Sequence, residues 1–112
     1  MCDRCGAALP GFGVIYGLVC THLVDGQVEE LIFCYLGGCR DAVLAGLVNV
    51  TTSPDDPAVR CTDDGDVLAS RSVETAMLAT DVDPDGDGAR YLQLCYAGGS
   101  RDRLLTNAGR TP

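Results

Sequence analysis

The sequence predicts a small α+β protein built from two similar copies in tandem, each with a cysteine turn, a β-hairpin and a helix. The first observation is that Cys34-Tyr-Leu-Gly-Gly-Cys39 lines up with Cys95-Tyr-Ala-Gly-Gly-Ser100. The second is that Cys2-Asp-Arg-Cys-Gly6 lines up with Cys61-Thr-Asp-Asp-Gly65. The third is that each pair of anchors encloses the same apolar pattern. Self-similarity at a fixed spacing indicates a repeated structural unit.

Chain length and one proline-rich break set the expected boundaries. The chain has 112 residues, and a piece of about 50 residues is marginal alone unless a metal, a disulfide or a partner supports it. Residues 51–57 are rich in proline and aspartate, as linkers are. We expect a first copy at 1–50, a linker at 51–60, a second copy at 61–107 and a tail at 108–112. We also expect the copies to pack as a pseudo-symmetric pair with a shared core.

Local signals place the elements of each copy. Asp25-Gly26 readily takes the positive φ values of a tight turn and so predicts a hairpin between two extended segments. The apolar pattern of residues 14–21 recurs at 73–80, so a matching hairpin is expected in the second copy. After Cys39, an apolar stripe at helical spacing predicts a helix with an acid in its first turn. The stripe consists of Val43, Leu44, Leu47 and Val48.

The cysteines of the first copy predict a metal site. The start of the chain lacks the cationic and apolar pattern of a signal peptide, so a cytoplasmic location is expected, where thiols stay reduced. Seven cysteines in that compartment indicate metal binding before disulfides. Four thiolates suit a tetrahedral zinc ion and leave no open position, so one structural zinc per chain is expected. The predicted ligands are Cys2, Cys5, Cys34 and Cys39.

Neighbouring residues support this site, and two other interpretations remain open. Gly37 and Gly38 allow the backbone to approach the sulfurs closely. Arg40 is expected to offset the negative charge of four thiolates. The alternatives are thiols buried as small apolar groups, or a disulfide pair.

A cysteine knuckle, a hairpin, and a helix that begins with the last ligand together resemble a treble-clef zinc finger. A zinc ribbon is the near alternative. The resemblance covers Cys2 to about Val48, with an echo from Cys61 to about Leu105. The chain also resembles the small four-cysteine zinc-finger proteins of haloarchaea. It departs from the usual pattern in its second cysteine pair, which is spaced Cys-x4-Cys rather than Cys-x2-Cys.

The second copy has lost part of the ligand set. Asp64 and Ser100 stand where the first copy has cysteines, which leaves Cys61 and Cys95. Serine is a poor zinc ligand, so this degenerate site is expected to hold no metal. Packing against the first copy is then expected to stabilise the second. A Cys61–Cys95 disulfide under oxidation is the alternative to reduced thiols.

Two polar residues near the hairpin turns are expected to be solvated. His22 is the only histidine, and a solvated strand end is favoured over a metal ligand. Asp81 opens Asp81-Val-Asp83-Pro-Asp85-Gly86, which imitates the start of a calcium loop. Leu92 stands where that loop needs a bidentate glutamate, so an acidic hairpin turn is expected instead.

The charge pattern bears on partners. The net charge is −8, all eight basic residues are arginine, and thirteen of the sixteen acids are aspartate. Lysine-free, aspartate-rich surfaces resemble those of proteins from salt-loving archaea, and a GC-rich bacterial genome is the alternative source of this bias. A negative surface disfavours binding to polyanions. The segment from Arg90 onward is the exception, with four arginines against one acid.

The sequence contains no recognisable nucleophile, base or open metal position, so no enzymatic activity is expected. The leading interpretation is a small zinc-binding adaptor or regulatory protein that contacts another protein. The alternative is a nucleic-acid-associated zinc finger whose Arg101 and Arg103 reach phosphates. The longest apolar stretch is too short to span a bilayer, so no membrane role is expected.

Overall fold

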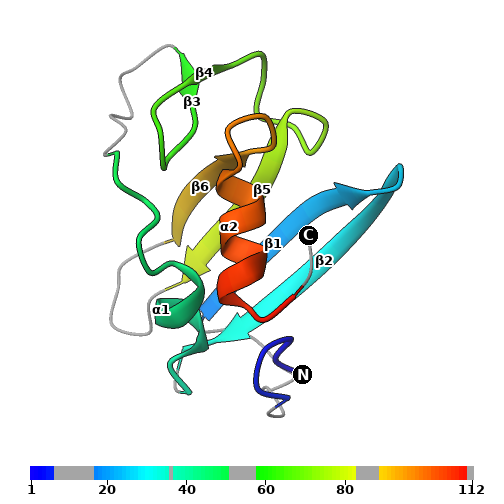
Figure 1. The fold of residues 1–112 in the computed structure, drawn as a ribbon, viewed down its shortest axis with the longest axis vertical. Coiled ribbons are helices and arrows are strands. Elements are labelled where there is room, and N and C mark those ends of the chain that lie inside the picture. The colour runs from blue at the N-terminus through cyan, green and yellow to red at the C-terminus, as the bar shows by residue number, and fades with distance from the viewer. Residues whose placement is uncertain (7–16, 36, 51–57, 83–88, 111–112) are drawn as a thin grey trace.

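The computed structural model describes residues 1–6, 17–35, 37–50, 58–82 and 89–110. Within these ranges the chain forms a mixed α+β fold (Figure 1), which confirms the predicted class. The strands are β1 (Gly17–Val24), β2 (Gln27–Cys34), β3 (Val59–Arg60), β4 (Val67–Leu68), β5 (Ala76–Val82) and β6 (Ala89–Cys95), and the helices are α1 (Cys39–Val43) and α2 (Ser100–Asn107). Most of the predicted linker, residues 51–57, lies outside the described residues, and β3 begins at its end.

One antiparallel sheet runs through both halves of the chain. Its strand order is β2-β1-β5-β6, so the hairpin of the first half joins the hairpin of the second through β1 and β5. Figure 1 shows α2 lying across one face of this sheet, with α1 beside the C-terminal end of α2. Strands β3 and β4 form a separate two-stranded sheet.

The first hairpin has the predicted turn. Asp25 and Gly26 take φ values of 51° and 79°, and Val24 pairs with Gln27 across them. This left-handed conformation matches the twist of the flanking strands, because mirror-image turns follow the natural right-handed strand twist. The turn between β5 and β6 lies outside the described residues.

The central pairing of the sheet joins β1 to β5. Cys20 lies opposite Ala79 in this antiparallel pair. Side chains alternate between faces along a strand, and the inward residues of β1 are buried while those between them are partly exposed. The helices therefore cover a single apolar face made by both hairpins.

The hydrophobic core is one cluster to which both halves contribute. Leu18 and Phe33 of the first hairpin, Met77 and Leu94 of the second, and Leu104 of α2 are fully buried. Burying one such side chain stabilises the fold by about 1.5–3 kcal/mol. The two halves thus share their main source of stability.

Helix α1 is shorter than the apolar stripe predicts. It ends at Val43, and the chain turns through Gly46 at a φ of 77°. Leu47 is nevertheless buried. Asn107 of α2 donates hydrogen bonds to the carbonyl oxygens of Val43 and Ala45, at 3.1 and 3.0 Å. The prediction of a longer helix was wrong because packing against α2, rather than helical periodicity, buries the last apolar residues.

The two polar residues expected to be solvated are both buried. His22 is 1% exposed and Asp81 is 3% exposed. Asp81 accepts two hydrogen bonds from Arg40, at 2.5 and 2.8 Å, and one from Arg90 at 2.8 Å. Burial raises the pKa of Asp81, but the two guanidinium groups outweigh it and hold the pKa below its usual value. An ion pair in the core therefore replaces the solvated strand end, and it links α1 to β5.

Replacing Asp81 with asparagine is expected to lower the free energy of unfolding by about 3 kcal/mol at neutral pH, because it removes the buried carboxylate that pairs with both Arg40 and Arg90. The carboxylate stabilises the fold above its unfolded pKa of about 3.9, and this stabilisation is lost as the pH falls through the lower folded value. Denaturant unfolding should show the largest difference from the native chain near neutral pH and a shrinking one below about pH 4.

Asp41 provides a matched control on the same arginine. Its side chain is 76% exposed and lies 3.6 Å from Arg40, so Asp41→Asn should change stability by less than about 0.5 kcal/mol. Equal losses for the two variants would contradict the assigned role of Asp81.

Among the described residues, neither helix has the length and apolar content needed to cross a membrane.

Candidate metal centre

The four predicted zinc ligands lie together. The Sγ atoms of the cluster all lie within 4.8 Å of one another, and those of Cys5 and Cys34 are 3.6 Å apart. Cys5 is exposed, whereas the other three are buried. The residues of the cluster are Cys2, Cys5, Cys34 and Cys39. Residues far apart in the sequence thus form one cluster that could hold a metal ion.

Backbone hydrogen bonds hold the N-terminal turn against β2. The amide of Gly6 donates to the carbonyl of Cys2 at 3.0 Å, which closes the turn. Asp3 donates its amide to the carbonyl of Ile32 at 2.8 Å, and its carboxylate accepts from the Ile32 amide at 2.7 Å. The amide of Cys34 donates to Cys2 Sγ at 3.3 Å. The first and third ligands are therefore positioned by the same strand.

The turn before Cys39 requires glycine at two positions, for two different reasons. A Cβ atom on Gly37 would lie 2.8 Å from Cys34 Sγ, closer than real Cβ contacts allow. Gly38 has a φ of 77°, a conformation that other residues adopt only with strain. These two glycines bring Cys39, the first residue of α1, back to the sulfur cluster.

This donor set fits zinc. A tetrahedral zinc ion with Zn–S bonds of about 2.3 Å needs sulfur atoms about 3.8 Å apart, and the Cys5–Cys34 separation of 3.6 Å is close to that value. Thiolates are the ligands of structural zinc sites. A metal held by these four groups would have a filled coordination sphere.

Ionisation of the cluster depends on the surrounding groups. Burial raises the pKa of Cys2, but backbone amide donors, among them those of Cys5 and Cys34, outweigh it and lower the pKa to about 6. Burial raises the pKa of Cys39 to about 12, and the neighbouring sulfurs add to this. Four thiolates this close repel one another, so full ionisation of the cluster requires a bound cation.

Arg4 is the cation at the cluster that sequence reasoning missed. Its Nη1 donates to Cys39 Sγ at 3.6 Å. Arg40, expected in that role, lies over the ring of Tyr35 and pairs with Asp81 instead. Arg4 sits between the two cysteines of the N-terminal turn, and that position is the signal in the sequence that identifies it.

The second half brings the equivalent residues together as well. Donor atoms of Cys61, Asp64 and Cys95 lie within 4.8 Å of one another. Ser100 Oγ is 3.5 Å from Cys61 Sγ and 3.6 Å from Cys95 Sγ. Cys61 and Cys95 are free thiols. These four residues thus lie close together, as the four cysteines of the first half do, with two sulfurs among them.

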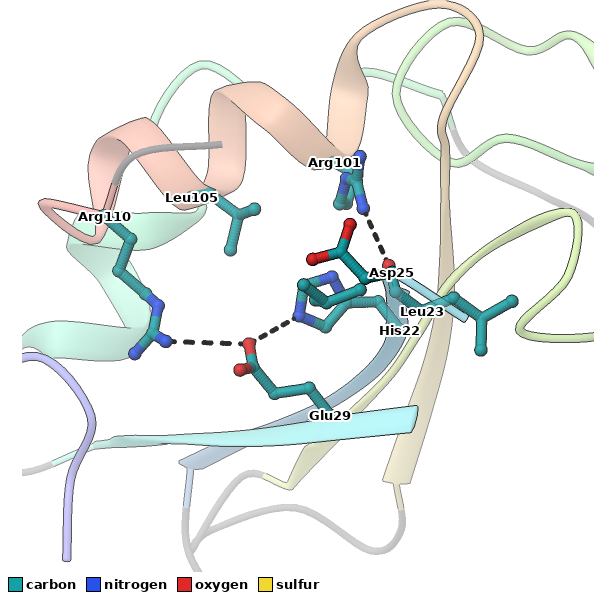
Figure 2. A pocket seen from close by; sticks show the side chains of 8 residues that line it. His22, Leu23, Asp25, Glu29, Arg101, Leu105 and Arg110 are labelled. Carbon is teal, nitrogen blue, oxygen red and sulfur yellow. Dashed lines mark hydrogen bonds and ion pairs between the residues drawn. The ribbon is translucent and has the colours of Figure 1, made fainter. Parts of the chain in front are cut away.

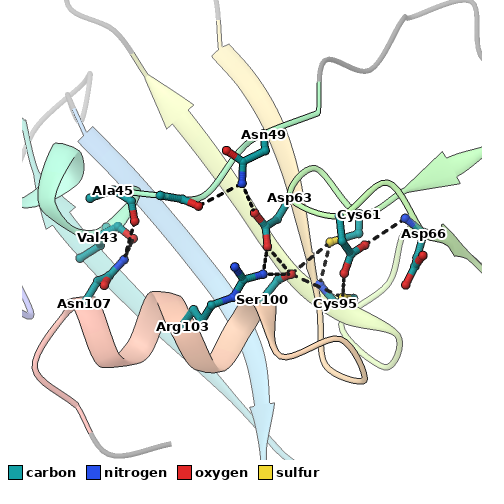
Figure 3. A network of polar contacts seen from close by, with 12 residues as sticks. Val43, Ala45, Asn49, Cys61, Asp63, Asp66, Cys95, Ser100, Arg103 and Asn107 are labelled. Carbon is teal, nitrogen blue, oxygen red and sulfur yellow. Dashed lines mark hydrogen bonds and ion pairs between the residues drawn. The ribbon is translucent and has the colours of Figure 1, made fainter.

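A hydrogen-bond network occupies this second cluster (Figure 3). Asp63 is buried and accepts hydrogen bonds from Ser100 at 2.8 Å, from Asn49 at 2.7 Å, and from Arg103. A buried carboxylate with three donors is well satisfied and rigidifies its surroundings. The network connects the turn after β3, the start of α2 and the segment after α1. Packing was the predicted stabiliser of this half, and these polar contacts supplement it.

Asp64 and Cys95 form the other side of the second cluster. The Cys95 thiol donates to Asp64 Oδ2 at 3.0 Å. This bond lowers the pKa of Asp64, whereas burial and the same carboxylate raise the pKa of Cys95. A Cβ atom on Gly98 would lie 2.8 Å from Cys95 Sγ, as one on Gly37 would from Cys34 Sγ.

Arg101 and Arg103, predicted as partner contacts, both make contacts within the chain. Arg101 lies 4.7 Å from the ring centroid of Tyr96 and donates to the carbonyl of Leu23 at 3.1 Å. Arg103 pairs with Asp63. Each guanidinium thus already makes contacts within the fold.

Comparisons with protein-family models, with curated proteins and with solved structures gave no match to this chain.

Proposed function

We propose that this chain is a small structural-zinc protein that acts as an adaptor or regulatory protein through contacts with another protein. The observation that carries the proposal is the cluster of four cysteine sulfurs. With zinc bound it would have no position for water or substrate, so its role would be to hold the fold. One zinc per chain is proposed, bound in the first half only, and no enzymatic activity.

The arrangement around the cluster supports a treble-clef-like finger. The order is a cysteine turn, the hairpin β1–β2 ending at Cys34, and α1 beginning at Cys39. We propose this class for the first half.

We also propose that the two halves arose by internal duplication and pack as a pseudo-symmetric pair. Cys20 and Ala79 are aligned by the repeat and also lie opposite each other in the sheet. The flanking pairs are Val19 with Thr80 and Thr21 with Leu78. Because Val19 aligns with Leu78 and Thr21 with Thr80, exchanging the two strands leaves the pairing unchanged. A two-fold axis at this point requires that pattern.

The sheet face away from the helices is the surface we assign to the partner. Leu31 and Leu92 point into the core, so the alternation of a strand directs Val28 and Tyr91 to the opposite face. Val28 is 63% exposed and Tyr91 is 60% exposed. Exposed aromatic and apolar groups are common at protein interfaces.

Nucleic-acid binding is the second candidate, resting on the arginines of the C-terminal segment. The internal contacts of Arg101 and Arg103 and the net charge of −8 favour a protein partner, because phosphate groups bind best to cationic groups that have no other partner.

We propose a cytoplasmic setting of high salt. The lysine-free, aspartate-rich composition supports this setting.

The test is affinity capture of the tagged chain in high salt, with and without nuclease treatment. A protein partner should be recovered in both arms and lost on Val28→Asp/Tyr91→Asp, while zinc content is unchanged. Val67→Asp is the matched control, because Val67 is 64% exposed but belongs to β4, outside the four-stranded sheet. Recovery of nucleic acid without any protein would refute the adaptor proposal.

A further inference from the structure

A pocket lies between the first hairpin and α2 (Figure 2). Its volume is about 300 Å³. Acidic, basic and apolar side chains line it. They include His22, Asp25, Glu29, Arg101, Leu105 and Arg110. None of these residues belongs to either cysteine cluster.

His22 brings an unpartnered polar atom to this pocket. Its Nε2 lies 2.9 Å from Glu29 Oε1, so Nε2 carries a hydrogen that the carboxylate accepts. Its Nδ1 is buried and has no hydrogen-bond partner among the described residues. Figure 2 shows the imidazole between Glu29 and helix α2. A buried polar atom without a partner is costly, and in the neutral imidazole a ligand with a hydrogen-bond donor would satisfy Nδ1.

Arg101, which also lines the pocket, has surroundings similar to those of Arg40. Each guanidinium lies over a tyrosine ring, at 4.7 Å for Arg101 and 5.2 Å for Arg40. Two nitrogens of Arg40 donate hydrogen bonds to the carboxylate of Asp81. The sequence alignment of the two halves places His22 of β1 at the position that Asp81 has in β5. Strand β1 therefore provides no carboxylate at this position for Arg101. Arg101 instead donates a hydrogen bond from Nε to the carboxylate of the adjacent Asp102 and one from Nη1 to a backbone carbonyl.

The opposite wall adds a second guanidinium and limits the ligand's charge. Arg110 Nη2 is 3.6 Å from Glu29 Oε1 and remains 37% exposed. Asp25 and Glu29 also line the pocket, so a doubly charged anion would meet two carboxylates. A single negative charge meets only half of that repulsion while it still faces both guanidinium groups. Leu105 offers an apolar surface beside them.

We propose that this pocket binds a small monocarboxylate whose α-amino or α-hydroxyl group donates a hydrogen bond. The carboxylate lies between Arg101 and Arg110, and corresponds to the carboxylate that Asp81 gives to Arg40. The α-substituent donates to Nδ1 of His22, and a short aliphatic chain contacts Leu105. The inference is independent of the protein partner proposed above, because it concerns the helix-covered side of the sheet.

Leucine, 2-hydroxy-4-methylpentanoate, 4-methylpentanoate and inorganic phosphate form a matched set of probes. Each is titrated at constant ionic strength into the zinc-loaded, isotope-labelled chain, while the imidazole signals of His22 and the Nε–H signal of Arg101 are followed by NMR. At least one of the first two probes should shift these signals saturably. The probe without an α-substituent should bind about tenfold more weakly, as loss of one hydrogen bond implies. Above about pH 8, where most of the phosphate carries two negative charges, phosphate should leave the signals in place.

Two variants test the site. His22→Asp/Glu29→Arg copies the Asp81–Arg90 pair into the pocket, so it should remain folded with its zinc and lose binding. Arg110→Gln should weaken binding at least tenfold, and Arg71→Gln, at an exposed position outside the pocket, should leave it unchanged. Equal shifts with phosphate, unchanged binding by the double variant, or no shift with either α-substituted probe would overturn the proposal.

Discussion

Replacing Cys39 with serine is expected to abolish zinc binding and to unfold most of the chain. Cys39 is fully buried at the start of α1, within the sulfur cluster. Serine is a poor zinc ligand, and a structural zinc contributes on the order of 10 kcal/mol of folding free energy. That is comparable with the whole stability of a small domain. Because the core is shared, loss of the first half should destabilise the second.

Native mass spectrometry with elemental analysis measures the metal, and denaturant unfolding measures the stability. Cys20→Ala is the control, because Cys20 is fully buried but belongs to neither cluster. Burial, with the charge of Asp81, raises the pKa of the Cys20 thiol to about 12, so it stays neutral. That variant should keep its zinc and lose about 1 kcal/mol. Full zinc content in Cys39→Ser, or none in the native chain, would refute the assignment.

The double variant Asp64→Cys/Ser100→Cys is expected to bind a second zinc ion. Cys61, Asp64 and Cys95 already have donor atoms within 4.8 Å, and Ser100 Oγ lies 3.5 and 3.6 Å from the two sulfurs. Gly98 leaves the same space beside Cys95 that Gly37 leaves beside Cys34. Two further thiolates would complete a tetrahedral set and raise the midpoint of thermal unfolding.

The single variants separate metal binding from other effects of the substitutions. Asp64→Cys and Ser100→Cys each provide three thiols, so each is expected to bind the second zinc far more weakly than the double variant. Asp64→Ala/Ser100→Ala removes the same polar groups without adding sulfur and should bind one zinc. If the double variant also binds only one, the second cluster is not a degenerate copy of the first site.

Several features were predictable because they depend on short stretches of sequence. Asp25-Gly26 predicted its turn because positive φ at both positions is a local property. The clustering of Cys2 and Cys5 with Cys34 and Cys39 was predictable because the cysteine spacing and the neighbouring glycines both indicate one metal site. The mixed α+β class followed from the same signals.

Other features depend on contacts between distant residues. Helix α1 is short because Asn107 and the packing of α2 stabilise the end of the apolar segment. Arg40 pairs with Asp81 and not with the sulfur cluster, because Asp81, forty-one positions away in the sequence, provides a buried carboxylate. His22 lies beneath α2 because the first hairpin and α2, which are distant in the sequence, pack against each other.

The sequence by itself determined the cysteine cluster, the hairpin turn and the recurrence of a pattern, because each is encoded by residues near one another or by residue type. Only the tertiary structure decided that β1 pairs with β5, that both halves share one core, and that Asp63 and Ser100 occupy the second cluster with hydrogen bonds. The physical reason is that burial and pairing of polar groups depend on which chain segments meet in space. Two aligned strand positions show this: Asp81 of β5 forms an ion pair with Arg40 of α1, whereas His22 of β1 lines a pocket beneath α2.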